Sequence, residues 1–436
     1  MVQLKILVGN RELNKMIREL ELILYFEDFF TRKRNLESSS ELPSEIICFQ
    51  ILPRLPSKSL MRFKCVCKSW SSLVQNPSFA DAHQSLHRNK LTHLRLTIWD
   101  TATRQQHFLS VQINQDGSPT PAIHLLNLPT MSNDHRLYNA QSTNGLVCLY
   151  LSNTLSHDHT LAYLDPPNFI FNPCTRESII LPHASPPYCT SHITYHFGFS
   201  PLTNEYKVLQ VQTFRPHDSI PTDLTFMFKM FKLGTSLWRR LEIDLNHLAF
   251  DPLECPFKVQ GVCINGAIHW MHWKENVVVV FDIGDEKFRV IPLPQDYICF
   301  IHRILGEVMR NVLEVDGYLA LIGDKKLMTL QNMMALWILK DYQNQVWVRK
   351  TIMLPHCWRA LGCLVPLRTI HNGELLLQST VLRVHGPPGH VRVHVYNMES
   401  KSFSESEIGL PSEWTFRNDA RLKLVASYDD NIVPLR

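Results

Sequence analysis

Two cysteines, Cys65 and Cys67, lie one residue apart in the basic segment "LPRLPSKSLMRFKCVCKSW", which runs from Leu52 to Trp70. The segment contains five lysines or arginines and no acidic residue. Paired thiolates can bind zinc, and clustered cations can bind phosphate groups or acidic proteins. These residue types allow three kinds of chemistry: a metal site, a nucleic-acid interface or a protein-docking surface.

The spacing of the two cysteines argues against the metal site. The pattern predicts one helix over residues 58–74, in which successive side chains are rotated by about 100°. Cys65 and Cys67 then point in roughly opposite directions and cannot share one ion. No further Cys or His pair follows nearby at zinc-finger spacing, so we expect no metal and no cofactor here.

The same predicted helix favours a protein partner over a nucleic acid. A helix that reads bases exposes basic and amide side chains. Here Lys64 and Lys68 instead lie along one edge of a wide apolar face, which suits a hydrophobic contact with an acidic rim. That apolar face consists of Leu60, Phe63, Cys67, Trp70 and Val74.

Composition limits the classes of protein to which the chain can belong. The 436 residues are 45% hydrophobic and 19% charged, which is typical of globular proteins, and the net charge of +4 gives no case for nucleic acid. The eleven cysteines have no regular spacing, and no secretory signal precedes them, so we expect free thiols in the cytosol or nucleus. The apolar run at 277–281 is far too short to cross a membrane.

Three parts follow one another along the chain. Residues 1–41 predict an amphipathic helix and a charged linker; the helix either binds a partner, packs on its own chain or belongs to a poorly ordered tail. Residues 42–90 predict a compact helical unit. Residues 91–436 show short apolar strands with a period of two, which predicts an all-β domain.

A degenerate repeat accounts for the size of the β domain. An Asn-Gly or Asp-Gly pair, which favours turns with positive φ, precedes a strand and a hairpin in repeats of about fifty residues. Between Gly145 and Gly266 the interval fits two repeats, and the copy between them, at 231–243, lacks the pair. A ring of such small sheets buries faces that one sheet alone cannot, so the sequence predicts a mainly β protein with a β-propeller of about six blades. The segment 421–428 is the candidate strand for closing the ring. The pairs are Asn144-Gly145, Asn265-Gly266, Asp316-Gly317 and Asn372-Gly373.

Longer motifs resemble a known family. The segment "LPSEIICFQILPRLPSKSLMRFKCVCKSWSSLVQNPSFADAH" resembles the F-box of the large plant class. The segments "FNPCTRESIILP", "FGFSPLTNEYKV" and "FDIGDEKFRVIPLP" resemble the F-box-associated domain that usually follows it.

The resemblance implies a role as the receptor of a ubiquitin ligase. An F-box docks on a Skp-type adaptor and through it on a cullin scaffold, and the propeller holds a target protein. The receptor then promotes the reaction by holding the target close to the catalytic subunits, so this chain needs no catalytic residue. The adaptor-facing residues implied are Leu42, Pro43, Ile46, Ile51, Leu52, Leu55, Pro56, Leu60, Lys64, Val66, Cys67, Lys68 and Trp70.

Two other functions stay open on the sequence. A propeller that binds a glycan or small ligand could select targets by that ligand, because aromatic rings stack on sugars. We interpret the tryptophans at 238, 270, 273, 337 and 347 instead as packing between blades. The second alternative is a propeller enzyme, which is disfavoured because the chain contains none of the common catalytic motifs.

The histidines give the enzyme alternative little support. His192 and His196 would share one face of a strand, and with Cys189 they have a spacing that could bind metal. We interpret them as exposed loop histidines. His269 and His272 are expected to face opposite sides of a strand.

Overall fold

The computed structural model describes residues 51–435 except 66–67, 88–92, 101–102, 115–117, 129–136, 152, 155–166, 184–189, 215–224, 254–256, 258–260, 303–311, 324–332, 354–363, 371–373, 379–388, 412–420 and 427–430. The chain divides into two compact units, Met1–Leu55 and Pro56–Arg436. The predicted helix within residues 1–41 and the start of the F-box lie outside the described residues. In the first unit, the described part contains one short 3-10 helix, η2 (Leu52–Arg54).

The second unit begins with helices. They are α3 (Ser57–Phe63), α4 (Lys68–Val74) and α5 (Pro77–His87). The prediction of one continuous helix over 58–74 is therefore wrong. The amide of Cys65 bonds to the carbonyl of Arg62, a tight turn that ends α3.

The break between α3 and α4 lets two aromatic rings meet. Phe63 and Trp70 pack edge to face with ring centroids 5.1 Å apart. In one straight helix, residues seven apart are separated by about 10.5 Å along the axis, so these rings could not touch in this way. The contact between Phe63 and Trp70 therefore accompanies the turn after α3, which the helical spacing of the apolar residues did not predict.

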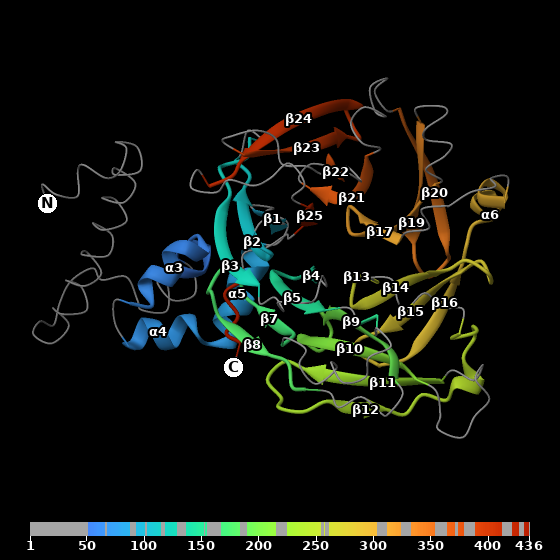
Figure 1. The fold of residues 1–436 in the computed structure, drawn as a ribbon, viewed down its shortest axis with the longest axis horizontal. Helices are drawn as coiled ribbons and strands as arrows, with labels where there is room; N and C mark the ends of the chain where they lie inside the picture. Colours follow the sequence, from blue (N-terminus) through green and yellow to red (C-terminus); the bar gives the residue numbers. More distant parts are fainter. Residues whose placement is uncertain are drawn as a thin grey trace, which may run out of the picture. The chain divides into compact units, whose positions relative to one another are not determined.

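Six antiparallel blades follow, arranged around a common centre (Figure 1). From the inner to the outer strand, blade 1 contains β25 (Arg421–Ala426), β1 (His93–Asp100), β2 (Gln105–Gln112) and β3 (Ile123–Leu128). Blade 2 contains β4 (Tyr138–Thr143), β5 (Leu146–Leu151), β7 (Phe169–Phe171) and β8 (Ser178–Ile180). Blade 3 contains β9 (Thr190–Ser200), β10 (Glu205–Phe214), β11 (Thr225–Lys232) and β12 (Arg239–Leu241), with β6 (Asn153–Thr154) paired to β9.

The remaining blades repeat the same order. Blade 4 contains β13 (Val262–Ile264), β14 (Ala267–His272), β15 (Val277–Asp282) and β16 (Phe288–Pro292). Blade 5 contains β17 (Val312–Val315), β18 (Tyr318–Ile322), β19 (Met333–Asp341) and β20 (Val346–Met353). Blade 6 contains β21 (Val365–Ile370), β22 (Glu374–Gln378), β23 (His390–Asn397) and β24 (Ser402–Gly409). The mainly β fold with a six-bladed propeller is confirmed.

The repeated turns adopt the backbone that the sequence predicts. Asn144, Asn265 and Asp316 have φ of 48°, 49° and 52°, and the glycine after each is also positive. Blade 3 lacks the Asn-Gly pair, and there Asn204 takes the same conformation with φ 53°. Asn tolerates the left-handed region better than most residues, so the turn survives the loss of glycine. The pair at 372–373 lies outside the described residues.

The end of the chain closes the ring, as predicted for 421–428. Strand β25 pairs antiparallel with β1, with Leu94 opposite Ala426 and Trp99 opposite Arg421. Each pair of neighbouring blades shares an apolar cluster. Between blades 6 and 1 this cluster includes Leu96, Ile98 and Val393, all buried. Blade 1 is therefore built from both ends of the domain.

Among the described residues of the propeller, two short helical segments lie between strands, and the sequence predicted no long helical stretch there. They are η4 (Leu245–His247) and α6 (Gln295–His302). Tyr297 of α6 is fully buried, packs edge to face on Trp337, and donates its hydroxyl to the carbonyl of Ile322. Helix α6 therefore packs into the junction between blades 4 and 5.

Candidate functional site

The helical unit buries several of the residues expected to face the adaptor. Leu60 is fully buried, Trp70 is 4% exposed and Leu52 is 1% exposed. These side chains therefore belong to the interior of the chain. Leu42, Pro43, Ile46, Val66 and Cys67 lie outside the described residues.

The accessible part of the predicted surface is smaller and basic. Pro56 and Lys68 are exposed, and Ile51, Leu55 and Lys64 are half-buried. The predicted list omitted Lys58 and Arg62, which are exposed on α3.

Lys64 has a partner in the propeller. Its Nζ lies 3.6 Å from Oε1 of Glu177, in the turn between β7 and β8. Two polar contacts from α5 reach neighbouring turns: Nδ2 of Asn204 donates to Asp81 at 2.9 Å, and Gln84 donates to the carbonyl of Asn144 at 3.4 Å. The helices therefore contact the end of the propeller where the first two strands of blades 2 and 3 turn.

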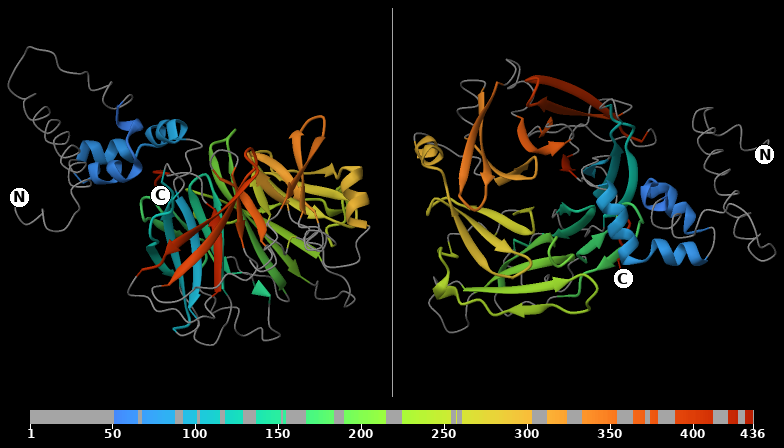
Figure 2. Two further views of the ribbon diagram at one scale, coloured as in Figure 1. Left: turned by 90° about the horizontal axis from the view of Figure 1, so that it is seen from above. Right: turned by 180° about the vertical axis from the view of Figure 1, so that it is seen from behind.

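The C-terminal tail reaches the same turns, beside α5 in both views of Figure 2. Asn431 is fully buried, and its Nδ2 donates to the carbonyl of Asn144 at 2.6 Å and to the hydroxyl of Tyr206. The amide of Leu435 donates to Glu177, which also faces Lys64. Sequence analysis missed this tail. Its only signal was an apolar end, "NIVPL", after the closing strand.

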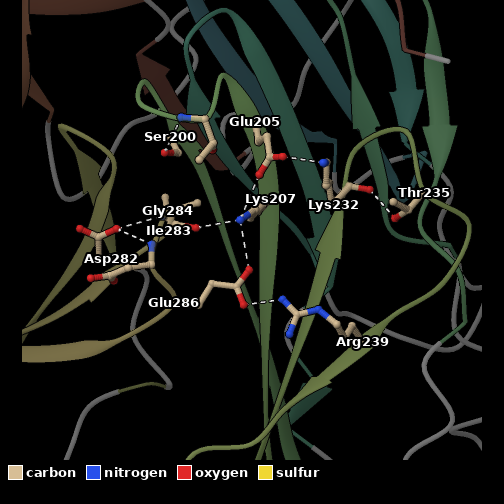
Figure 3. A network of polar contacts seen from close by, with 12 residues as sticks. Ser200, Glu205, Lys207, Lys232, Thr235, Arg239, Asp282, Ile283, Gly284 and Glu286 are labelled. Atoms are coloured by element: carbon tan, nitrogen blue, oxygen red, sulfur yellow. Dashed lines mark hydrogen bonds and ion pairs between the residues drawn. The ribbon is translucent and has the colours of Figure 1, made fainter.

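A chain of alternating charges joins blades 3 and 4 at the same end of the propeller (Figure 3). Nζ of Lys207 contacts Glu205 and Glu286, each at 3.1 Å, and the carbonyl of Ile283 at 3.0 Å. The outer oxygens of the two carboxylates bond to Lys232 and Arg239. The motifs "NEYKV" and "FDIGDEKF" thus meet across one blade junction.

The cations keep both carboxylates ionised. A hydrogen bond from Lys232 lowers the pKa of Glu205, with Lys207 adding to the effect against partial burial. Burial alone would raise the pKa of Glu286, but hydrogen bonds from Arg239 and Lys207 outweigh it, so this pKa is also lowered. Lys207 is only 7% exposed. The network therefore stabilises the junction of blades 3 and 4 by attraction between ionised side chains.

The histidine predictions are partly wrong. His192 and His196 are buried on β9, not exposed in a loop, and His196 packs edge to face on Trp270. Burial lowers the pKa of His196 to about 3, so the ring is neutral at physiological pH. His269 bonds to Tyr342 and His272 to the carbonyl of Asp251, partners on different sides of β14, as expected. Cys189 lies outside the described residues.

The tryptophans behave as predicted with one exception. Trp270 and Trp337 are buried in the clusters on either side of blade 4, where Trp347 also packs in part. Trp238 packs on Phe231 and donates to the carbonyl of Pro182 at the junction of blades 2 and 3. Trp273 is 42% exposed, with Lys274 beside its ring. Trp273 therefore does not fill a blade junction.

Within the part of the chain that the structure describes, no three His, Cys, Asp or Glu side chains are grouped to hold a metal ion. Among the described helices, none has the length and apolar character needed to span a bilayer.

Comparison with known proteins agrees with this architecture. The family "F-box associated beta propeller domain" matches residues 95–430, and the family "F-box-like" matches residues 39–80. F-box protein At4g19940 of Arabidopsis thaliana is 24% identical over 403 residues, covering 86% of this chain and 89% of that protein.

Two further Arabidopsis thaliana relatives are similar along most of their length. F-box protein At1g30790 is 25% identical, covering 84% of this chain and 90% of its own. F-box/kelch-repeat protein At4g19930 is 26% identical, covering 81% of this chain and 77% of that protein. With the family match spanning all six blades and a helical unit before them, the chain belongs to the F-box proteins that carry an F-box-associated β-propeller domain.

Proposed function

We propose that this chain is the substrate-recognition subunit of a Skp–cullin–F-box ubiquitin ligase in the cytosol or nucleus. The observation that carries the proposal is the succession of an F-box-like match and a complete propeller in one chain. The helical unit docks on the Skp-type adaptor, which joins it to the cullin. The propeller holds a target protein, and the transfer chemistry belongs to other subunits.

The exposed cations of α3 and α4 suit an acidic adaptor surface. Lys58, Arg62 and Lys68 are exposed, and no acidic residue lies between Leu52 and Trp70. Such rim charges mainly raise the association rate and are screened by salt. The buried Leu60 and Trp70 act indirectly, by holding the helices in place.

The target-binding surface is proposed at the propeller end away from α5. The turns near α5 are short, as between β4 and β5 or β7 and β8. The strand ends opposite them are joined by longer segments, including 155–168, 215–224 and 379–389. Long loops on a rigid scaffold commonly carry recognition residues.

The proposal is tested by calorimetric titration of the full chain with a purified Skp-type adaptor, with and without a chelator. We expect binding at micromolar or tighter Kd that the chelator does not change. Lys68→Ala should weaken it by less than about 1 kcal/mol, a loss that disappears at high salt. The matched control is Lys350→Ala, an exposed lysine on β20, which should have no effect. Absence of binding would remove the ligase assignment, and sensitivity to the chelator would restore a metal site at the cysteines.

A glycan-binding propeller remains the second candidate because of one observation. Trp273, in the turn between β14 and β15, is exposed at the end of blade 4 away from α5. Exposed indole rings can stack on sugars. A glycan array probed with the full chain and with Trp273→Ala tests this function. Signal lost in the variant would support it, whereas an array without signal would reject it.

A further inference from the structure

A cavity of about 410 Å³ opens beside the charge network of Figure 3, where blades 3 and 4 meet. Its charged lining consists of three cations and two carboxylates: Lys207, Lys232, Arg239, Glu205 and Glu286. The turn between β11 and β12 adds hydroxyl and apolar groups, among them Thr235 and Leu237. The cavity lies at the end of the propeller that α5 contacts, away from the long loops.

The charged groups that line this cavity have unused hydrogen-bond donors. Lys207 uses its three protons on Glu205, Glu286 and the carbonyl of Ile283. Each oxygen of both carboxylates already faces a cation. A metal ion would therefore find no uncommitted carboxylate oxygen among these residues.

The two outer cations keep donors for a ligand. An ammonium group has three protons and a guanidinium group has five N–H donors. Among the described residues, the ammonium group of Lys232 bonds only to Glu205 and the guanidinium group of Arg239 only to Glu286. Their side chains are 49% and 62% exposed. The site can therefore accept an anion without breaking the internal network.

The surroundings favour a peptide side chain over a free ion. Leu237 is 75% exposed at the cavity, a large apolar surface that an inorganic anion would leave in water. A peptide that places an apolar residue beside an acidic one would cover Leu237 while its anion meets Lys232 and Arg239. Charge-assisted hydrogen bonds of this kind are stronger than neutral ones.

We propose that this cavity binds an anionic side chain, carboxylate or phosphate, of an acidic peptide segment with a neighbouring apolar residue. Lys232 and Arg239 hold the anion, and Leu237 contacts the apolar neighbour. Lys207 does not touch the ligand; it fixes the two carboxylates that orient the outer cations. This site is separate from the adaptor-docking surface on α3 and α4, so it stands whether or not the chain binds an adaptor.

The test is fluorescence anisotropy of the full chain with three short labelled peptides. One alternates leucine with glutamate, one carries phosphoserine in place of glutamate, and one carries glutamine. We expect the two anionic peptides to bind and the glutamine peptide to bind at least about tenfold more weakly, because charge-assisted hydrogen bonds are lost. The anionic peptide that binds more tightly shows whether the cavity prefers a carboxylate or a phosphate.

Matched variants connect binding to the cavity. The double variant Lys232→Gln with Arg239→Gln should lose binding about tenfold or more, as expected for two charge-assisted bonds. Arg240→Gln is the control, because Arg240 is equally exposed on β12 but pairs with Glu242 and does not line the cavity. Thermal melting checks that all variants fold.

Three results would overturn the proposal: no binding of either anionic peptide, equal binding of the glutamine peptide, or equal losses in the double variant and in Arg240→Gln. Adaptor titration on the same proteins separates the two proposals. Normal adaptor binding with no peptide binding rejects the cavity alone. Peptide binding without adaptor binding rejects the ligase role alone.

Discussion

At the scale of single residues, Lys207 is a buried cation at the junction of blades 3 and 4. It is 7% exposed and has two carboxylates and a carbonyl as partners, all within 3.1 Å. Glu286 and Ile283 belong to the next blade along the chain. One side chain therefore adds an electrostatic link to the apolar packing between blades 3 and 4.

Replacing Lys207 by Met should destabilise the domain. Removing one partner of a buried ion pair commonly costs about 3–5 kcal/mol, but Glu205 and Glu286 are partly exposed and water can reach them. We expect a loss of about 2–3 kcal/mol in the free energy of unfolding, measured by denaturant titration. Lys232→Met is the control: it breaks an exposed pair and should cost under about 1 kcal/mol. Equal losses would contradict the central role of Lys207.

The same network predicts a dependence on pH. The folded-state pKa values of Glu205 and Glu286 are both lowered. Their stabilisation is present above the unfolded-state pKa of about 4.3 and is lost as the pH falls through the folded values. The stability gap between the wild type and Lys207→Met should therefore be constant from neutral pH to about pH 5 and shrink below about pH 4. A gap that widened in acid would show that the carboxylates are not what Lys207 stabilises.

At the scale of elements, the blades depend on close approach of neighbouring strands. Gly198 of β9 lies against blade 4: a Cβ atom there would lie 2.0 Å from Cδ1 of Ile283 and 3.2 Å from Sγ of Cys263. The motif "FGFSP" therefore contains glycine for space. The helical unit shows the same logic, because the break between α3 and α4 brings Phe63 onto Trp70.

Gly198→Ala should push Ile283 away and loosen the junction of blades 3 and 4. Overpacking typically costs about 1–3 kcal/mol, and we expect a loss in this range from thermal melting. Gly409 on β24 is the matched control, because a Cβ there meets nothing within 4 Å. Gly409→Ala should leave stability nearly unchanged. If both variants melt like the wild type, the junction is softer than its packing implies.

At the scale of the whole molecule, the ring is closed by pairing a strand from the C-terminus with one from the start of the domain. Strand β25 is the inner strand of blade 1, and the residues after it bond to Asn144 of blade 2 and Tyr206 of blade 3. One end of the chain thus joins three blades.

Truncation before residue 421 should lower the melting temperature of the entire propeller in one cooperative transition. It removes the inner strand of blade 1 and leaves the edge of β1 unpaired. Truncation before residue 431 is the comparison. It keeps β25 and removes only the tail, including the buried hydrogen bonds of Asn431, and should cost less. An unchanged melting curve for the shorter chain would contradict closure by β25.

Features that depend on neighbouring residues could be predicted from the amino-acid sequence. The Asn-Gly and Asp-Gly turns, the period of the strands and the repeat length were sufficient to predict a six-bladed propeller and the segment that closes it. Positive φ at Asn144, Asn265 and Asp316 is a local property of the turn, so it can be read without a fold.

Contacts between residues that are distant in the sequence could not be predicted in this way. Lys207 and Glu286 are 79 residues apart, and Asn431 and Asn144 are 287 apart. His192 was mistaken for a loop residue because local pattern does not reveal which blade will cover it. The break after α3 was missed because apolar residues at helical spacing fit one helix or two equally well. Such contacts depend on how whole blades and helices pack. The resulting burial then determines the charge state and the accessibility of each side chain.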